Sequence, residues 1–91
     1  MSTLHTLSAL PHSEACEDCL RLLADGDALL LMGDGVYAAP LAPRSEGIEV
    51  FVLASDAKAR GVEQSLSDLE HIDMGQFVQL TTRFPRQLAW Y

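Results

Sequence analysis

Hydrophobic and polar positions divide the chain into short strands that alternate with helices. The clearest strand covers residues 27–32 (DALLLM), a run that is too short for a buried helix and is bounded by glycines. Such a run is typical of a strand covered on both faces, as in the interior of a parallel sheet. Residues 33–35 (GDG) predict a tight turn, because glycine allows positive φ and close backbone approach. Residues 36–39 then predict a short helical turn that ends at Pro40.

Four more segments have the pattern of strands. Residues 3–7 alternate between polar and apolar side chains, and residues 48–53 (IEVFVL) are rich in β-branched and aromatic residues. Residues 62–70 predict a loop or turn that leads into a short strand at about 70–72. Residues 87–91 (QLAWY) predict a last strand that ends in Trp90 and Tyr91. An aromatic edge of this kind is either folded under the domain or covered by a partner.

Three helices are predicted between these strands, each with recognisable end signals. Ser13 is a suitable N-cap for a first helix that ends at Asp25-Gly26, with Glu14 and Glu17 in its first turn. At 100° per residue one side of this helix is apolar. That side carries Ala15, Cys16, Cys19, Leu20, Leu22 and Leu23.

The second and third helices are predicted from the capping residues at their ends. Ser55 is predicted to cap a helix over residues 57–60, which Gly61 closes at the C′ position. Asp73 is the predicted N-cap of the last helix, where Gln76 completes a capping box. Pro85 ends that helix.

This alternation predicts the fold class. Strands that alternate with helices favour an α/β fold, here a small three-layer α/β/α domain over residues 1–91. The sheet is expected to be mainly parallel and to have about five strands. No repeat, low-complexity tract or linker divides the chain.

The composition and charge of the chain limit the kinds of function that it can have. The chain has 91 residues, of which 48% are hydrophobic, and its formal net charge is −7. So small a domain leaves much of its surface exposed, so this apolar content favours association with other subunits. The negative charge argues against direct nucleic-acid binding, which depends on neutralising phosphates. With no membrane-length apolar run, no signal-peptide pattern and only two closely spaced cysteines, we expect a soluble cytoplasmic protein.

Two cysteines are the residues with most chemical interest. Cys16 and Cys19 form a C-x-x-C motif at the start of the first helix, as in dithiol redox proteins. A helix N-terminus favours a thiolate, but the two carboxylates between the cysteines disfavour it. Both thiols also lie on the apolar side of the helix, so burial as small hydrophobic residues is the simpler interpretation. A metal cluster with His12 would have three ligands and no evident fourth.

Other polar residues favour structural roles. His5 and His71 each lie in or beside a predicted strand. Gly33 and Gly35 form only a fragment of a dinucleotide-binding fingerprint, which a tight turn explains more simply. Asp34 is expected to hydrogen-bond its own backbone in that turn, with catalysis as the lesser alternative.

Three segments of the sequence resemble a known family. These are LHTL (residues 4–7), CLRLLADGDALLLMGDGVYAA (19–39) and IDMGQFVQLTTRFPRQLAWY (72–91). The LRLL-x-x-GDALLL-x-x-DGVYAA pattern and the FVxLTxxxPxQxAW ending are similar to those of the DsrH/TusB family. The resemblance covers nearly the whole chain in the right order.

The resemblance implies a subunit of a sulfurtransferase complex that is not catalytic alone. In this relay a persulfide sulfur passes through a complex with TusC-like and TusD-like subunits to a TusE-like acceptor, and ends in 2-thiolation of the tRNA wobble uridine. The chemistry is thiol attack on a persulfide, so no metal or organic cofactor is expected. The alternatives are a DsrH-type subunit in dissimilatory sulfur oxidation and a free-standing C-x-x-C dithiol protein.

By the same resemblance, Cys19 is the candidate sulfur-carrying residue. It falls where DsrH-type members carry their cysteine, whereas Cys16 has no counterpart. The loop at residues 54–61 lacks the cysteine that is expected to accept sulfur in TusD and DsrE subunits. The resemblance therefore favours a mainly architectural subunit, with Cys19 as an auxiliary persulfide site or as a packing residue.

Overall fold

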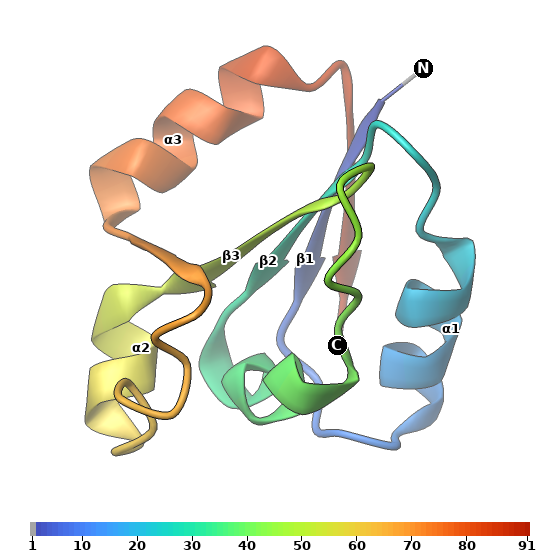
Figure 1. Ribbon diagram of the computed structural model, residues 1–91. Coiled ribbons are helices and arrows are strands. Elements are labelled where there is room, and N and C mark those ends of the chain that lie inside the picture. The colour runs from blue at the N-terminus through green and yellow to red at the C-terminus, as the bar shows by residue number, and fades with distance from the viewer. Residues whose placement is uncertain (1) are drawn as a thin grey trace.

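The protein, described for residues 2–91 in a computed structural model, is built around one parallel sheet (Figure 1). Within those residues the sheet has five strands in the order β4-β3-β2-β1-β5, and every neighbouring pair is parallel. This arrangement confirms the predicted α/β class. The single domain predicted over residues 1–91 remains a prediction, and Met1 lies outside the described residues. The strands are β1 (Thr3–Leu7), β2 (Ala28–Leu31), β3 (Glu49–Leu53), β4 (Glu70–Ile72) and β5 (Arg86–Trp90).

The strand order places the helices on the two faces of the sheet. The chain steps from β1 to β4 in one direction, through α1 (Glu14–Leu22), the 3₁₀ helix η1 (Gly33–Leu41) and α2 (Ala54–Ala59). Right-handed crossovers in one direction put these three connections on the same face. The chain then returns across the whole sheet to β5, so α3 (Met74–Arg83) covers the other face (Figure 1).

Two hydrophobic cores form, one on each face of the sheet. In β2 every residue is buried, as the apolar run predicted. Leu29 and Leu31 point into the larger core under α1, η1 and α2, whereas Ala28 and Leu30 point into the core under α3. This alternation is the period-two geometry of a strand. The prediction of an interior strand buried on both sides is therefore confirmed.

Several predicted capping groups are confirmed. The Ser13 hydroxyl accepts a hydrogen bond from the backbone N–H of Cys16, at 3.2 Å. Asp73 and Gln76 form the predicted capping box at the start of α3. Gly61 follows α2 with a φ of 70°. These short-range signals determined where three of the helix ends lie because their partners are only a few residues away.

Three predicted helix details are wrong. Pro40 does not end the turn after β2, because η1 continues to Leu41 with Pro40 inside it. The fixed φ of proline suits a 3₁₀ helix, whose φ lies between −50° and −70°. Ser55 does not cap α2, since the helix begins at Ala54 directly after β3 and Ser55 lies inside it.

The end of α1 is the third difference. The helix stops at Leu22 instead of Asp25, with Leu23 in an extended conformation. The backbone N–H of Ala24 donates to the Asp27 carboxylate instead of continuing the helical pattern. Leu22, the last residue of the helix, is 55% exposed, although the periodicity placed it on the apolar side.

Candidate functional site

The two thiols are buried beneath α1. Cys16 and Cys19 are both 0% exposed, and both are free. They belong to the larger core, together with residues of β1 and β2 such as Leu7 and Leu29. The prediction that they fall on the apolar side of the helix is confirmed. A reagent can reach either sulfur only if α1 moves away from the sheet.

The environment of Cys19 opposes the thiolate form. Burial, followed by the neighbouring Cys16, raises the pKa of Cys19 from 9.0 to about 12. The thiolate is the nucleophile in sulfur exchange, so its population governs the rate. At neutral pH such a thiol is therefore in its protonated form. In this conformation the group packs as a small hydrophobic side chain.

The residues weighed as a metal cluster do not come together as one. No three His, Cys, Asp or Glu side chains within residues 2–91 are arranged to hold a metal ion. His12 is exposed and has a φ of 66°, whereas both thiols lie inside the core. His12 therefore does not join Cys16 and Cys19 in the three-ligand arrangement that the sequence itself disfavoured.

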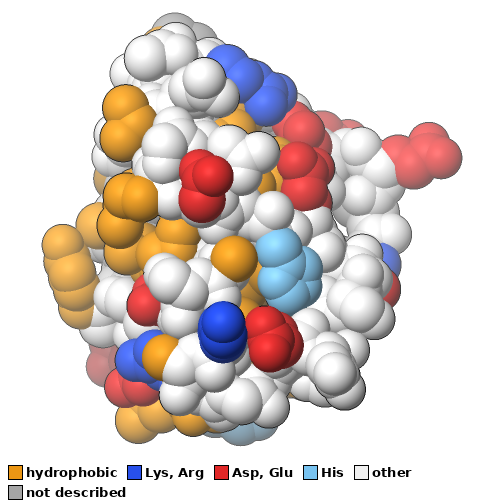
Figure 2. Space-filling model, turned by 90° about the vertical axis from the view of Figure 1, so that its left-hand side faces the viewer, with side chains coloured by type: hydrophobic (Ala, Val, Ile, Leu, Met, Phe, Trp, Pro, Cys, Tyr) orange, Lys and Arg blue, Asp and Glu red, His pale blue; other side chains and the backbone are white. Residues whose placement is uncertain are grey.

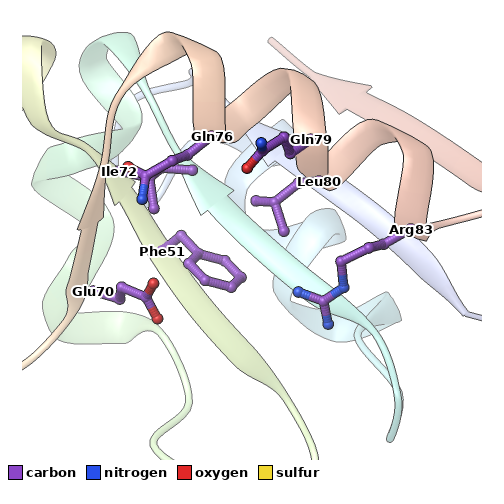
Figure 3. Close-up of a pocket in the computed structure, with 7 residues that line it drawn as sticks. All are labelled: Phe51, Glu70, Ile72, Gln76, Gln79, Leu80 and Arg83. Carbon is purple, nitrogen blue, oxygen red and sulfur yellow. The ribbon is translucent and has the colours of Figure 1, made fainter.

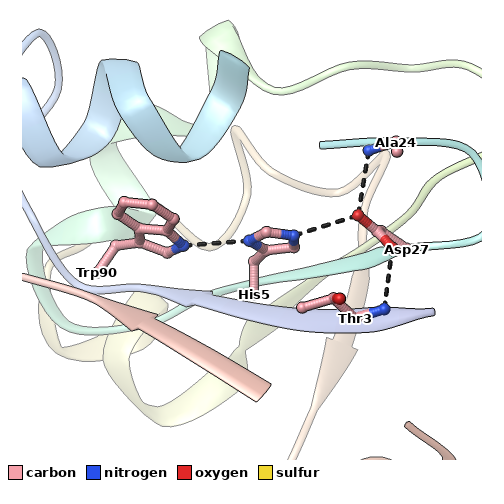
Figure 4. Close-up of polar contacts among 5 residues, drawn as sticks. All are labelled: Thr3, His5, Ala24, Asp27 and Trp90. Carbon is pink, nitrogen blue, oxygen red and sulfur yellow. Dashed lines mark hydrogen bonds and ion pairs between the residues drawn. The ribbon is translucent and has the colours of Figure 1, made fainter. Parts of the chain in front are cut away.

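A buried polar network joins three strands of the sheet (Figure 4). The indole N–H of Trp90 donates to Nδ1 of His5 at 3.1 Å, and Nε2 of His5 lies 3.2 Å from Oδ2 of Asp27. The Asp27 carboxylate also accepts the backbone N–H groups of Thr3, at 2.9 Å, and of Ala24, at 3.1 Å. His5 and Asp27 are 2% and 6% exposed. The structural role predicted for His5 is confirmed.

Only Trp90 of the terminal aromatic pair shows a predicted outcome, and cover by a partner stays a prediction for Tyr91. Trp90 is folded under and packs against the larger core, where it bonds to His5. Tyr91, the next residue, is 86% exposed. His71 also has a structural contact, because its Nε2 lies 2.9 Å from the carbonyl oxygen of Leu66.

The protein should become less stable in acid, because the stabilising effect of the Asp27 carboxylate is lost there. Burial alone would raise the pKa of Asp27, but the hydrogen bonds from Thr3, Ala24 and His5 together lower it below 3.8. Its stabilising effect is therefore complete above the ordinary pKa, and is lost as pH falls through the lower pKa of the folded state. We expect the free energy of unfolding, measured with urea, to fall steeply below about pH 4. An Asp27→Asn variant should lose part of this slope, and an unchanged slope would contradict the role of Asp27.

The glycine turn after β2 is held by a carboxylate from another element. The backbone N–H of Gly33 donates to Oδ2 of Asp56 on α2, at 2.7 Å. Asp34 instead pairs with Arg60, whose Nε lies 3.3 Å from Oδ1. The expected bond of Asp34 to its own backbone is not observed among the described residues. Asp56 was missed in the sequence, because only the fold brings it to Gly33.

Exposed apolar side chains gather where the strands end. The loops after the carboxyl ends of β1, β2 and β5 lie at the same edge of this parallel sheet (Figure 1). We name four exposed residues of these segments the apolar rim. They are Leu10 at 56%, Tyr37 at 42%, Leu41 at 41% and Tyr91 at 86% exposed.

A second apolar area lies on α3. Met74 and Val78 are 56% and 59% exposed, and they share one side of the helix at i and i+4. Figure 2 views the face that carries α2 and α3, and it shows hydrophobic side chains gathered along one side of that face. Exposed apolar areas of this kind mark surfaces used in association.

A shallow pocket lies between α3 and the β3–β4 edge of the sheet (Figure 3). Its volume is about 160 Å³, and Phe51 and Leu80 lie within it while Glu70 and Arg83 stand on either side. Neither thiol lines it, because both lie in the core on the other face of the sheet. The pocket therefore offers packing space, separate from the sulfur atoms. Its lining residues are Phe51, Glu70, Ile72, Gln76, Gln79, Leu80 and Arg83.

Across residues 2–91, we find no helix with the length and apolarity that a membrane crossing requires.

Comparisons with known proteins agree with this architecture. The family described as "DsrH like protein" matches residues 11–87. Protein TusB of Pectobacterium parmentieri is 40% identical over 94 residues, which cover 96% of this chain and 99% of that protein. Protein TusB of Escherichia coli (strain K12) is 42% identical, with the same coverage. The solution structure of protein Tm0979 from Thermotoga maritima has the same fold, with a TM-score of 0.68 over 88% of this chain and 91% of its own, at 21% identity. Because the family match and these relatives span most of the sequence, the chain belongs to the DsrH family.

Proposed function

We propose that this protein is a mainly architectural subunit of a TusBCD-type sulfur relay, which passes persulfide sulfur towards 2-thiolation of the tRNA wobble uridine. Its membership of the DsrH family and its TusB relatives support a place in this relay, in the cytoplasm. The observation that carries the architectural role is the burial of both thiols, each 0% exposed, which also raises the pKa of Cys19. A subunit that has no available thiolate contributes binding surfaces to the complex, and not a nucleophile.

Cys19 is the candidate for an auxiliary persulfide site. In that step the Cys19 thiolate attacks the outer sulfur of a donor persulfide. The donor S–S bond breaks, a new S–S bond forms on Cys19, and the donor leaves as a thiolate, so no outside oxidant is needed. The step requires α1 to move, because the sulfur atom is enclosed in the core.

The partners proposed for this subunit are TusC-like and TusD-like proteins, with a TusE-like acceptor reached through the complex. Two exposed areas support such an assembly. The apolar rim lies at the carboxyl edge of the sheet, and Met74 and Val78 lie on α3. Burial of apolar surface is the main driving force of stable association, so such areas are expected to be covered in a permanent complex.

The same observations weigh against a free-standing dithiol protein. A dithiol reductase needs a low-pKa thiolate that a substrate can reach. Here the C-x-x-C thiols are both fully buried, and the pKa of Cys19 is raised rather than lowered. Such a reductase would reduce insulin, and that activity would disappear when either cysteine is replaced.

Co-expression tests the architectural role. We expect the chain to co-purify with TusC-like and TusD-like subunits as a stable complex through size exclusion. A Val78→Asp variant places a charge in the α3 apolar area, and a Tyr91→Asp variant places one in the apolar rim. At least one of them should weaken assembly, whereas the exposed Lys58→Asp should not. A chain that remains strictly monomeric beside both partners would overturn the proposal.

The contribution of Cys19 can be measured in the reconstituted relay. We expect a Cys19→Ala complex to keep most of the tRNA 2-thiolation, because the buried thiol mainly packs. Incubation of the folded complex with a persulfide donor whose outer sulfur is labelled should leave little one-sulfur adduct on this chain by intact mass. Cys16→Ala is the matched control, since it removes the other buried thiol of α1. Loss of thiolation in an intact Cys19→Ala complex would instead make Cys19 a required relay site.

A further inference from the structure

The hydrogen-bond partners of the buried His5 determine which ring nitrogen carries its proton. The indole N–H of Trp90 can only donate, so Nδ1 of His5 must accept that hydrogen bond. The neutral imidazole therefore carries its proton on Nε2, which donates to the Asp27 carboxylate. Figure 4 shows the three side chains in a line, with His5 between the indole and the carboxylate.

A second proton on His5 would break one of its two side-chain hydrogen bonds, the one with Trp90. The proton would enter at Nδ1, so that two N–H donors would face each other where a hydrogen bond of 3.1 Å now exists. On the other side, the positive ring would form a charge-assisted hydrogen bond with the Asp27 carboxylate across the same 3.2 Å contact. The bond to Asp27 is thus strengthened while the bond to Trp90 is lost.

We propose that His5 and Trp90 form a proton-sensitive latch, in which protonation of His5 at Nδ1 releases the Trp90 side chain from its place against the core under α1. This inference does not depend on the proposed function. Asp27, just before β2, is the charged side chain bonded to His5. The helix α1 carries the thiols Cys16 and Cys19 on its core side, and β5 carries Arg86 beside Thr3. The charged side chains of α1 are exposed or half-buried, and they are Glu14, Glu17, Asp18 and Arg21.

The structure indicates that the indole moves while the backbone stays. The carbonyl oxygen of Trp90 accepts hydrogen bonds from the backbone N–H of Ser8, at 2.9 Å, and from its hydroxyl, at 3.2 Å. These bonds hold the end of β5 against β1. The indole itself is only partly buried at the edge of the sheet, and Tyr91 beyond it is almost free of the domain. Rotation of the side chain outwards therefore needs no change in strand pairing.

Release of Trp90 has a consequence for the thiols. Trp90 packs against the core that contains Cys16 and Cys19, and Figure 4 shows its indole lying beneath a helix, coloured as α1 is in Figure 1. The outward rotation removes part of the support under that helix. The latch thereby couples a proton on His5 to the enclosure of the sulfur atoms.

The test uses the natural probe that the chain provides. Trp90 is the sole tryptophan in the sequence, so tryptophan fluorescence reports on the latch alone. At neutral pH we expect imidazole ¹⁵N shifts to place the His5 proton on Nε2. When the pH is lowered until the ¹⁵N shifts show a second proton on His5, the Trp90 indole N–H resonance should lose its hydrogen-bonded shift. The fluorescence should move to the red and become more sensitive to acrylamide, with far-UV circular dichroism unchanged.

Two variants separate the latch from other acid effects. In His5→Asn the amide oxygen takes the position of Nδ1 and accepts from Trp90 without titrating, so the fluorescence transition should disappear. His12→Asn removes an exposed histidine at a positive φ that asparagine tolerates, and it should leave the transition in place.

Three results, each measured on the wild-type protein, would overturn the latch. One is a His5 proton on Nδ1 at neutral pH. Another is an indole that stays buried while His5 titrates. The third is a fluorescence change that occurs only together with global unfolding.

Discussion

Replacing Gly35 with alanine is expected to lower the free energy of unfolding by about 3 kcal/mol or more, the upper end of the overpacking range. A Cβ at this position would overlap the backbone carbonyl oxygen of Leu7, at the end of β1. That oxygen already accepts a hydrogen bond from Met32, so it cannot move without disturbing the pairing of β1 with β2. Urea unfolding of the purified protein, followed by circular dichroism, measures the change.

Gly75 provides the matched control for the same substitution. It lies in the first turn of α3, and its nearest contact for a new Cβ is the Asp73 carboxylate at 3.4 Å. Alanine has the higher helix propensity, so Gly75→Ala should stabilise the protein by about 0.5 kcal/mol. Equal effects at the two positions would show that the close approach of Gly35 to β1 does not exist in solution.

Replacing Asp27 with alanine is the other large effect that we expect, about 3–5 kcal/mol of lost stability. The carboxylate is the acceptor for the backbone N–H groups of Thr3 and Ala24 and for His5. Its removal leaves three donors in a site that is 6% exposed, where water cannot easily replace it. The measurement is again urea unfolding, at pH 7.

The exposed carboxylate of Asp68 is the control that shows whether the burial of Asp27 causes the loss of stability. The pKa of Asp68 is also lowered, chiefly by its hydrogen bond to Arg44, but both side chains of this pair are exposed. Solvent screens such a pair, so Asp68→Ala should change stability little. A loss at Asp27 no larger than at Asp68 would contradict the structural role of the network.

Most of the fold could be predicted because its signals are local. The burial of β2 follows from the run at residues 28–31, and the capping box of α3 follows from Asp73 and Gln76, three residues apart. The errors at the helix boundaries came from local contacts that the periodicity did not reveal. The helix α1 ends early where Asp27, just before β2, accepts the N–H of Ala24 three residues away.

The candidate site was less predictable, because its residues come from distant parts of the chain. Cys16 and Cys19 were correctly placed on the apolar side of their helix, but their complete burial depends on β1 and β2 beneath them. Asp56 at Gly33 and Trp90 at His5 are separated by 23 and 85 residues along the chain. No periodicity or motif connects such pairs before the sheet exists.

By itself, the sequence determined a parallel α/β domain, its strand and helix order, and its membership of the DsrH family, because hydrophobic periodicity, capping residues and family motifs can all be read along the chain. The tertiary structure alone decided that the thiols are enclosed and that Asp27 is a buried acceptor shared by three donors. It also decided that Trp90 closes onto His5. The physical reason is that desolvation and hydrogen-bond geometry depend on which distant residues meet. Pairing of β1 with β2 brings Asp27 to Thr3 and His5, and the return of the chain from β4 to β5 brings Trp90 to His5.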